Sequence, residues 1–277
     1  MLTGEQIDRW LREDIGHHDV TNDVPGETTG RLLAREAGTA AGIEAAAAVF
    51  EHLAVDAETS VQDGDPVDAG DVVLRTTGPA RETLRAERVA VNLAAHASGI
   101  ATKTRQAVDR AREADPDVRI AGTRKTTPGL RGVEKRAIVA GGGDSHRLDL
   151  SHMVLIKDNH IAELGVETAV DRFQERASVA TRIEVEAESE PEARRAIAAG
   201  ADIVLLDNFA PAELCAVVGS LAAPIAAADR EVLLEASGGI GLESVADYAD
   251  TGVDIVSMGS LTHSAGSLDY SFRTDSE

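Results

Sequence analysis

Short apolar runs and amphipathic stretches alternate through the second half of the chain, which is typical of strands followed by helices. Helical periodicity covers 190–199, 211–218 and 242–250, and Gly200 and Gly252 follow two of these stretches as helix-ending glycines. Near-continuous apolar strands that alternate with helices predict a parallel sheet covered by helices. Six strands are predicted, at 118–122, 153–157, 182–187, 202–207, 231–236 and 254–258.

The first half of the chain has a different pattern. Residues 4–14 predict an amphipathic helix in which Trp10 is a packing residue rather than a ligand-stacking one. Residues 30–77 are rich in strand-like segments and turn signals. Residues 80–113 predict a long helix that breaks at Ser98-Gly99, a hinge or domain boundary.

Charged residues or glycines lie at the end of each of the six predicted strands. Barrel enzymes carry their chemistry at the carboxyl ends of the strands, and six such ends would meet at one mouth. An open doubly wound sheet, the alternative, would spread them along an edge. The pattern therefore favours a β/α barrel with fewer than the usual eight strands. The residues at these ends are Arg124, Lys125, Lys157, Asp158, Glu186, Asp207, Ser237, Gly238, Gly239, Gly259 and Ser260.

The charge of the chain is strongly negative and unevenly distributed. The 48 acidic and 27 basic residues give a formal net charge of −21, which argues against binding to nucleic acid or anionic membranes. Because the acids are scattered, adaptation to a salty cytoplasm is favoured over an acidic patch for a basic partner. Residues 119–160 are locally basic, which predicts a pocket for a small anion. A solvated helix face is the alternative, and it fits Lys135 and Arg136.

Size and composition limit the class of protein. A chain of 277 residues with 43% hydrophobic residues can bury the core of one large domain or two modest ones. No apolar run reaches 18 residues, and the charged N-terminal segment lacks the apolar centre of a signal peptide. Cys215 has no second cysteine to pair with. A cytoplasmic protein is therefore expected.

Two kinds of candidate chemistry follow from the strand ends. Glycines after the last two strands allow backbone N–H groups to approach a phosphate, whereas the run at 141–143 lacks phosphate-loop spacing and indicates a flexible loop. Glu186 and Asp207 suit Mg²⁺ or ribose hydroxyls, and Glu184 on the same strand face could instead pair with an arginine.

The cations near the mouth indicate a ligand with several negative groups. They are Arg124, Lys125, His146, Arg147 and Lys157. No nucleophilic triad is apparent in the sequence. His17-His18-Asp19 lacks a third ligand at metal-site spacing, so a loop or helix-cap role is predicted for it.

Nine segments in order resemble the quinolinate phosphoribosyltransferase family. EDIGHHDVT (13–21) and ERVAVNLAAHASGIAT (87–102) match in the first half. In the second half the matching segments are GTRKTTPGLR (122–131), GGGDSHRL (141–148), VLIKDNHI (154–161), IEVEAES (183–189), LLDNF (205–209), EASGGI (235–240) and GSLTHS (259–264).

The resemblance implies an α/β fold with two domains. These are an N-terminal α/β sandwich over 1–98, to which the tail 264–277 returns, and a seven-stranded α/β barrel over 99–263. It implies a homodimer or higher homo-oligomer in which the sandwich of one subunit caps the barrel of the other. The implied enzyme is nicotinate-nucleotide diphosphorylase (carboxylating), a glycosyltransferase of the pentosyltransferase type. With Mg²⁺, it converts quinolinate and phosphoribosyl pyrophosphate into nicotinate mononucleotide, CO₂ and pyrophosphate in NAD biosynthesis.

The resemblance also implies roles for individual residues. Those assigned to the quinolinate carboxylates are Arg124, His146, Arg147, Lys157 and, from the partner subunit, a copy of Arg88. Lys125 would lie near the pyrophosphate, while Glu186 and Asp207 would serve the ribose hydroxyls and Mg²⁺; these three form the predicted catalytic set. The residues assigned to the 5′-phosphate are Ser237, Gly238, Gly239, Gly259 and His263.

The sequence departs from the family pattern at Gly122, Ser145 and His152, which neighbour the predicted site residues. Two alternative functions remain open. One is a related transferase acting on another pyridine or aromatic acid, and the other is a non-catalytic protein that binds a phosphoribosyl group or another anion. Retention of Lys125, Glu186 and Asp207 favours an enzyme.

Overall fold

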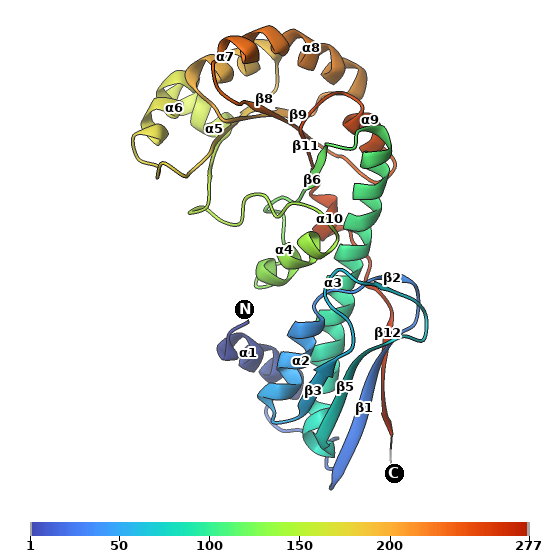
Figure 1. The fold of residues 1–277 in the computed structure, drawn as a ribbon. Coiled ribbons are helices and arrows are strands. Elements are labelled where there is room, and N and C mark those ends of the chain that lie inside the picture. Colours follow the sequence, from blue (N-terminus) through green and yellow to red (C-terminus); the bar gives the residue numbers. More distant parts are fainter. Residues whose placement is uncertain (1, 276–277) are drawn as a thin grey trace. The chain divides into compact units, whose positions relative to one another are not determined.

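The computed structural model describes residues 2–275, which divide into two units (Figure 1). The first unit contains the described residues up to Arg105, residues 127–142 and the described residues from Ser264 onward. The second contains residues 106–126 and 143–263. Within residues 2–275, none of the helices combines the length and apolar character needed to cross a bilayer.

The first unit is built on an antiparallel sheet in the order β12-β1-β5-β3. These strands are β1 (Glu27–Ala34), β3 (Asp56–Thr59), β5 (Val72–Pro79) and β12 (Tyr270–Asp275). A separate pair is formed by β2 (Gly38–Thr39) and β4 (Pro66–Val67). The helices are α1 (Gly4–Ile15), α2 (Ile43–His52), α4 (Arg131–Ala140) and the first part of α3 (Ala80–Ala114).

Alternating burial along β1 shows why this sheet forms a core, since the inward side chains are apolar. Leu32 on β1 and Leu74 on β5 are fully buried, as is Phe50 on α2. The ring of Phe50 stacks on Phe272 of β12, with 5.4 Å between centroids. The strand nearest the C-terminus therefore contributes directly to the core of the first unit.

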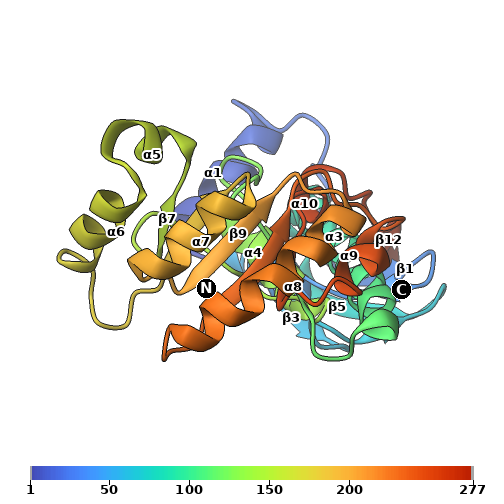
Figure 2. The ribbon, with the colours of Figure 1, turned by 90° about the horizontal axis from the view of Figure 1, so that it is seen from above.

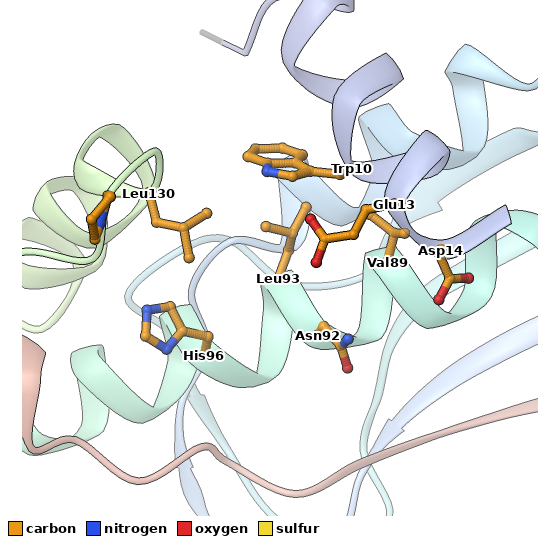
Figure 3. A pocket seen from close by; sticks show the side chains of 9 residues that line it. Trp10, Glu13, Asp14, Val89, Asn92, Leu93, His96 and Leu130 are labelled. Carbon is orange, nitrogen blue, oxygen red and sulfur yellow. The ribbon is translucent and has the colours of Figure 1, made fainter. Parts of the chain in front are cut away.

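Trp10 is half-buried on α1, where Ile7 and Leu11 are the buried residues. Figure 3 shows its indole beside a cavity, with Leu93 and His96 of α3 around the same space. This cavity measures about 410 Å³. The role of Trp10 as a packing residue stays a prediction, since one side of its ring faces this space.

The predicted break at Ser98-Gly99 is wrong, because α3 runs without interruption through both residues. Ser98 Oγ donates to the carbonyl of Ala41 at 3.0 Å. A Cβ on Gly99 would lie 1.8 Å from the carbonyl oxygen of Gly266. The small residues therefore allow close packing against α3 rather than a hinge in it.

The six strands predicted for the second half are all present, and every pair between them is parallel. They are β6 (Arg119–Ala121), β7 (Val154–Ile156), β8 (Ile183–Ala187), β9 (Ile203–Asp207), β10 (Leu233–Ser237) and β11 (Ile255–Ser257). The helices around them are α5 (Asp158–Leu164), α6 (Val166–Gln174), α7 (Glu190–Ala199), α8 (Pro211–Ala227), α9 (Val245–Ala249) and α10 (Ser260–His263). Figures 1 and 2 show α7 and α8 side by side over the sheet.

The strand order β6-β11-β10-β9-β8-β7 confirms the predicted incomplete barrel. The first strand pairs with the last, as closure of a barrel requires. On its other side β6 carries an isolated parallel bridge between Ala121 and Asp144. Within the described residues, this bridge stands where a seventh strand would lie.

Two expectations about local structure need correction. Lys135 on α4 is buried, so the solvated-face interpretation fits only Arg136. The helix predicted at 211–218 continues to Ala227 through an alanine-rich segment containing Pro224. The burial of Lys135 depends on packing that hydrophobic periodicity does not report, whereas beyond residue 218 the helix α8 buries Leu221 alone.

Candidate active site

A cavity of about 340 Å³ lies at the carboxyl ends of the strands in the second unit. Eight predicted site residues line it, namely Arg124, Lys125, His146, Arg147, Lys157, Glu186, Asp207 and Ser237. The other lining residues are Thr123, Leu155, Glu184, Leu205, Glu235 and Ser257. Residues spread over more than 130 positions of the chain are thus brought together, as the barrel arrangement predicts.

Strand register explains how the polar groups gather. Asp207 and Ser237 are paired partners at the ends of β9 and β10. Glu186, near the end of β8, is aligned with Leu205 two residues before Asp207. Parallel strands of matched length therefore present these side chains at neighbouring levels.

Lys157 follows β7 and is the N-cap residue before α5, and its ammonium donates to the carboxylate of Glu186. Lys157 remains about half exposed, whereas Glu186 is buried. Lys157, which the resemblance assigns to quinolinate, therefore contacts Glu186, which it assigns to the ribose. The contact satisfies the buried carboxylate of Glu186 with an opposite charge.

Arg147 is half-buried and lies near Arg124. Burial, followed by the positive charge of Arg124, lowers the pKa of Arg147, while Glu184 and Asp149 oppose this shift. The buried Nε of Arg147 has no hydrogen-bond partner within the described residues. Two guanidinium groups in this arrangement favour the binding of an anion between or beside them.

Two buried carboxylates lie among these cations, Glu184 from β8 and Glu235 from β10. His146 Nε2 lies 2.9 Å from Glu235 Oε2 and 3.8 Å from Glu184 Oε2. Burial, and then the negative charge of Glu235, raise the pKa of Glu184 well above its usual range. The three side chains place possible metal-ligand atoms within 4.8 Å of one another.

Glu235 is a site residue that the sequence reasoning missed. The available signal was a glutamate that follows three apolar residues, 232–234, within a predicted strand. The sequence analysis included it in the strand and assigned it no chemical role. Thr123 and Ser257 were also missed, because neither residue type marks a site by itself.

The glycines predicted for phosphate binding adopt conformations that other residues resist. Gly238 and Gly239 have φ values of 106° and 63°. A Cβ on Gly238 would lie 2.4 Å from Asn208 Oδ1 and 2.7 Å from the backbone nitrogen of Asn208. This backbone turn therefore depends on glycine at position 238.

Gly259 lies beside Lys125 and His263. A Cβ on Gly259 would lie 2.9 Å from Lys125 Cδ and 3.4 Å from His263 Nε2. Thr262 Oγ1 donates to the carbonyl of Lys125 at 2.6 Å, which ties α10 to the loop after β6. Gly238, Gly239, Gly259 and His263 are not among the residues that line the cavity itself.

Arg88 lies exposed on α3 in the first unit. Near the N-terminus, Asp19 accepts hydrogen bonds from the backbone of Thr21 and Asn22 and from Arg85 Nε. The bond from Arg85 holds the pKa of Asp19 well below its usual range. Asp19 therefore stabilises the loop after α1, in agreement with the loop role predicted for His17-His18-Asp19.

The departures from the family pattern lie in loops beside the site. The backbone nitrogen of Gly122 donates to the carbonyl of Asp144, next to the bridge that flanks β6. His152 Nδ1 accepts a hydrogen bond from the backbone of Leu148. Neither residue lines the cavity.

Comparisons with known proteins agree with the geometry. The family models for the N-terminal and C-terminal domains of quinolinate phosphoribosyl transferase match residues 18–98 and 100–273. A probable nicotinate-nucleotide pyrophosphorylase (carboxylating) of Methanothermobacter thermautotrophicus is 42% identical over 272 residues, covering 96% of this chain and 97% of the relative. The human nicotinate-nucleotide pyrophosphorylase (carboxylating) is 40% identical over 270 residues, covering 96% of this chain and 90% of the relative.

Solved structures support the same assignment. The nicotinate-nucleotide pyrophosphorylase from Francisella tularensis superposes with a TM-score of 0.89 at 32% identity, covering 99% of this chain and 98% of that one. NadC from Streptococcus pyogenes gives a TM-score of 0.85 at 37% identity, covering 99% of this chain and 97% of that one. The resemblance drawn from the sequence motifs is confirmed, and the chain belongs to the quinolinate phosphoribosyltransferase family.

Proposed function

We propose that this protein transfers the phosphoribosyl group of phosphoribosyl pyrophosphate to the nitrogen of quinolinate, with loss of CO₂, to give nicotinate mononucleotide for NAD biosynthesis. The observation that carries the proposal is one cavity, at the mouth of an incomplete barrel, that collects both cations and carboxylates. Membership of the family supports the same reaction.

Quinolinate has two carboxylates, and the cationic part of the cavity suits them. Arg124 is close enough to Arg147 for its charge to lower the pKa of Arg147, and His146 and Lys157 line the same space. Arginine forks bind carboxylates through two parallel hydrogen bonds. These four residues are proposed to hold the dianion.

The carboxylates of the cavity and the glycine-containing turn after β10 suit the sugar phosphate. Glu186 and Asp207 are proposed to contact the ribose hydroxyls, with Lys125 near the pyrophosphate. The turn formed by Ser237, Gly238 and Gly239 presents backbone N–H groups suited to the 5′-phosphate, and Gly259 and His263 are proposed to complete that subsite.

The reaction requires positioning and charge more than a protein nucleophile. The bond between ribose C1 and the pyrophosphate oxygen breaks, and the pyridine nitrogen supplies the electron pair for the new bond to C1. Carboxylates near the ribose stabilise the positive charge that develops there. The resulting pyridinium charge then stabilises the electron pair left at C2 when CO₂ departs, and a proton takes that position.

The donor set of Glu186 and Asp207 fits Mg²⁺, which prefers oxygen ligands and retains several waters. The cluster of His146, Glu184 and Glu235 fits it less well, because one of its three donors is an imidazole. Glu186 and Asp207 are therefore proposed to hold the ion, directly or through water. When bound, Mg²⁺ would neutralise charge on the departing pyrophosphate.

The proposed reaction is tested by CO₂ release from quinolinate labelled in its 2-carboxylate, in the presence and absence of phosphoribosyl pyrophosphate. We expect release only with both substrates. Turnover of nicotinate but not quinolinate would instead indicate a related transferase. Binding of either substrate without any release of CO₂ would indicate a non-catalytic protein.

A homodimer in which the partner subunit's Arg88 completes the quinolinate subsite is part of the proposal. The exposed position of Arg88 on α3 is compatible with a role outside its own unit. Arg88→Ala and Arg124→Ala proteins should each be inactive alone. Mixing them under conditions that exchange subunits should restore about a quarter of wild-type activity, since random pairing leaves one intact site in half of the dimers. No recovery despite demonstrated exchange would place both residues in one subunit's site.

Adaptation to high salt is proposed as the source of the charge of −21. Raising KCl from 0.1 M to 1 M shortens the Debye length from about 10 Å to about 3 Å and weakens repulsion between surface carboxylates. Thermal unfolding should therefore shift to higher temperature with added KCl, by about 2–4 °C for each kcal/mol of relieved repulsion. Equal stability in dilute buffer and molar KCl would contradict this explanation.

A further inference from the structure

Glu235 lies inside the strand β10, and its side chain lines the cavity rather than packing against apolar residues. Its side chain is about 1% exposed, and a carboxylate this buried needs an opposite charge or hydrogen-bond donors. The nearest charged or donor group shown for it is His146 Nε2, which lies 2.9 Å from Glu235 Oε2. The two atoms are within reach of each other, although the present angles are not those of a formed hydrogen bond.

His146 is held by a loop rather than by a helix or strand. It lies in the loop between α4 and β7, outside the regular helices and strands. Its backbone has a φ of 51°, held by a hydrogen bond from its own nitrogen to Asp144 Oδ1 at 2.6 Å. The side chain is about 11% exposed and faces two carboxylates, so the orientation of the ring depends on what contacts its nitrogens.

We propose that Glu235 is a positioning residue for His146: its carboxylate accepts the hydrogen of Nε2 and fixes the ring so that Nδ1, which carries a second hydrogen when quinolinate is bound, donates to a quinolinate carboxylate. The inference rests on the proposed function and deepens it, since it explains how one of the four quinolinate-binding residues is held. Fixing a ligand-binding side chain before substrate arrives reduces the entropy lost on binding.

Glu184 provides a matched comparison within the same cluster. It is the same residue type, equally buried, and two strands away in the same sheet. Its nearer approach to His146 Nε2 is 3.8 Å, beyond hydrogen-bond distance. Glu184→Gln therefore changes a neighbouring buried carboxyl group without removing the contact that positions the ring.

The first test is kinetic. Glu235→Gln should raise KM for quinolinate about 10- to 100-fold while KM for phosphoribosyl pyrophosphate stays near its wild-type value. His146→Gln should have a similar effect, and the double variant should be no worse than His146→Gln alone. Additive losses, or equal increases in both KM values, would overturn the proposal because Glu235 would then act independently of His146.

The second test needs no substrate. In protein labelled with ¹⁵N at histidine, the signals missing from His146→Gln identify the His146 ring. Glu235→Gln should change the distribution of the hydrogen between Nδ1 and Nε2, whereas Glu184→Gln should leave hydrogen on Nε2. An unaltered His146 signal in Glu235→Gln would overturn the proposal. If Glu235→Gln does not fold, Glu235→Asp keeps the charge but retracts it from Nε2, and the same spectral change is expected.

The two tests separate this inference from the reaction. Suppose that Glu235→Gln alters the His146 signal but the wild-type protein does not release CO₂ from quinolinate. The positioning role would then stand, and the proposed function would be contradicted. If instead the wild-type protein releases CO₂ and Glu235→Gln does not change its kinetics, the proposed function would stand and the positioning role would be contradicted.

Discussion

We expect Arg147→Ala to weaken quinolinate binding by about 2–5 kcal/mol, roughly 30-fold to several thousandfold in affinity. The half-buried guanidinium lies near Arg124 and close enough to Glu184 for charge to matter, so its loss leaves one substrate carboxylate without a partner. Isothermal titration of the protein with quinolinate measures the effect directly. Arg195→Ala, which removes an exposed arginine from α7, is the matched control and should bind normally.

The Arg147→Lys variant separates charge from geometry. A lysine keeps the positive charge but cannot form two parallel hydrogen bonds with a carboxylate. Partial recovery of affinity is therefore expected. Because the Debye length is about 3 Å in roughly molar salt, the loss in Arg147→Ala should persist in concentrated KCl. Quinolinate affinity that is unchanged in Arg147→Ala would remove this residue from the site.

Asp207→Asn should lower kcat by about 10²- to 10³-fold, the usual effect of removing one electrostatic contact to a developing charge. The substitution preserves the shape of the side chain at the end of β9 but removes its negative charge. Its hydrogen-bonded neighbour is Asn208, whose Nδ2 donates to Asp207 Oδ2 at 2.6 Å. Quinolinate affinity should remain close to the wild-type value, since Asp207 is assigned to the ribose side of the cavity.

Single-turnover measurements with saturating substrates test this expectation. Asp247→Asn, an exposed residue on α9, removes the same charge from the same unit and should react normally. If quinolinate affinity falls while the rate for bound substrates is unchanged, Asp207 contacts quinolinate and its assignment to the ribose is wrong.

The barrel could be predicted from sequence because its strands are short and almost wholly apolar. The first four residues of β9 are apolar and buried, so a hydrophobic run marks that strand clearly. All five residues of β8 are buried too, although two of them are Glu184 and Glu186. The residues just beyond those runs fall at strand ends by necessity, which is why Lys157, Asp207 and Ser237 were found. Parallel register then brings them together without further information.

Other features depend on contacts between distant parts of the chain. Ser98-Gly99 resembles a helix break, and only the approach of Gly266 explains why small residues occur there. Glu235 occurs within a strand segment, and its importance becomes visible only when His146 is placed beside it. The assignment of Arg88 to another subunit's site stays a prediction, since it concerns assembly.

The pairing of β1 with β12 has a consequence for synthesis of the protein. Leu32 cannot meet Phe272 across the sheet until the last strand has left the ribosome. The intervening parallel strands emerge earlier and can close while the antiparallel sheet still has an open edge along β1. The unit that begins the chain is therefore finished last, and during translation its exposed edge is the part of the molecule most in need of protection by a chaperone.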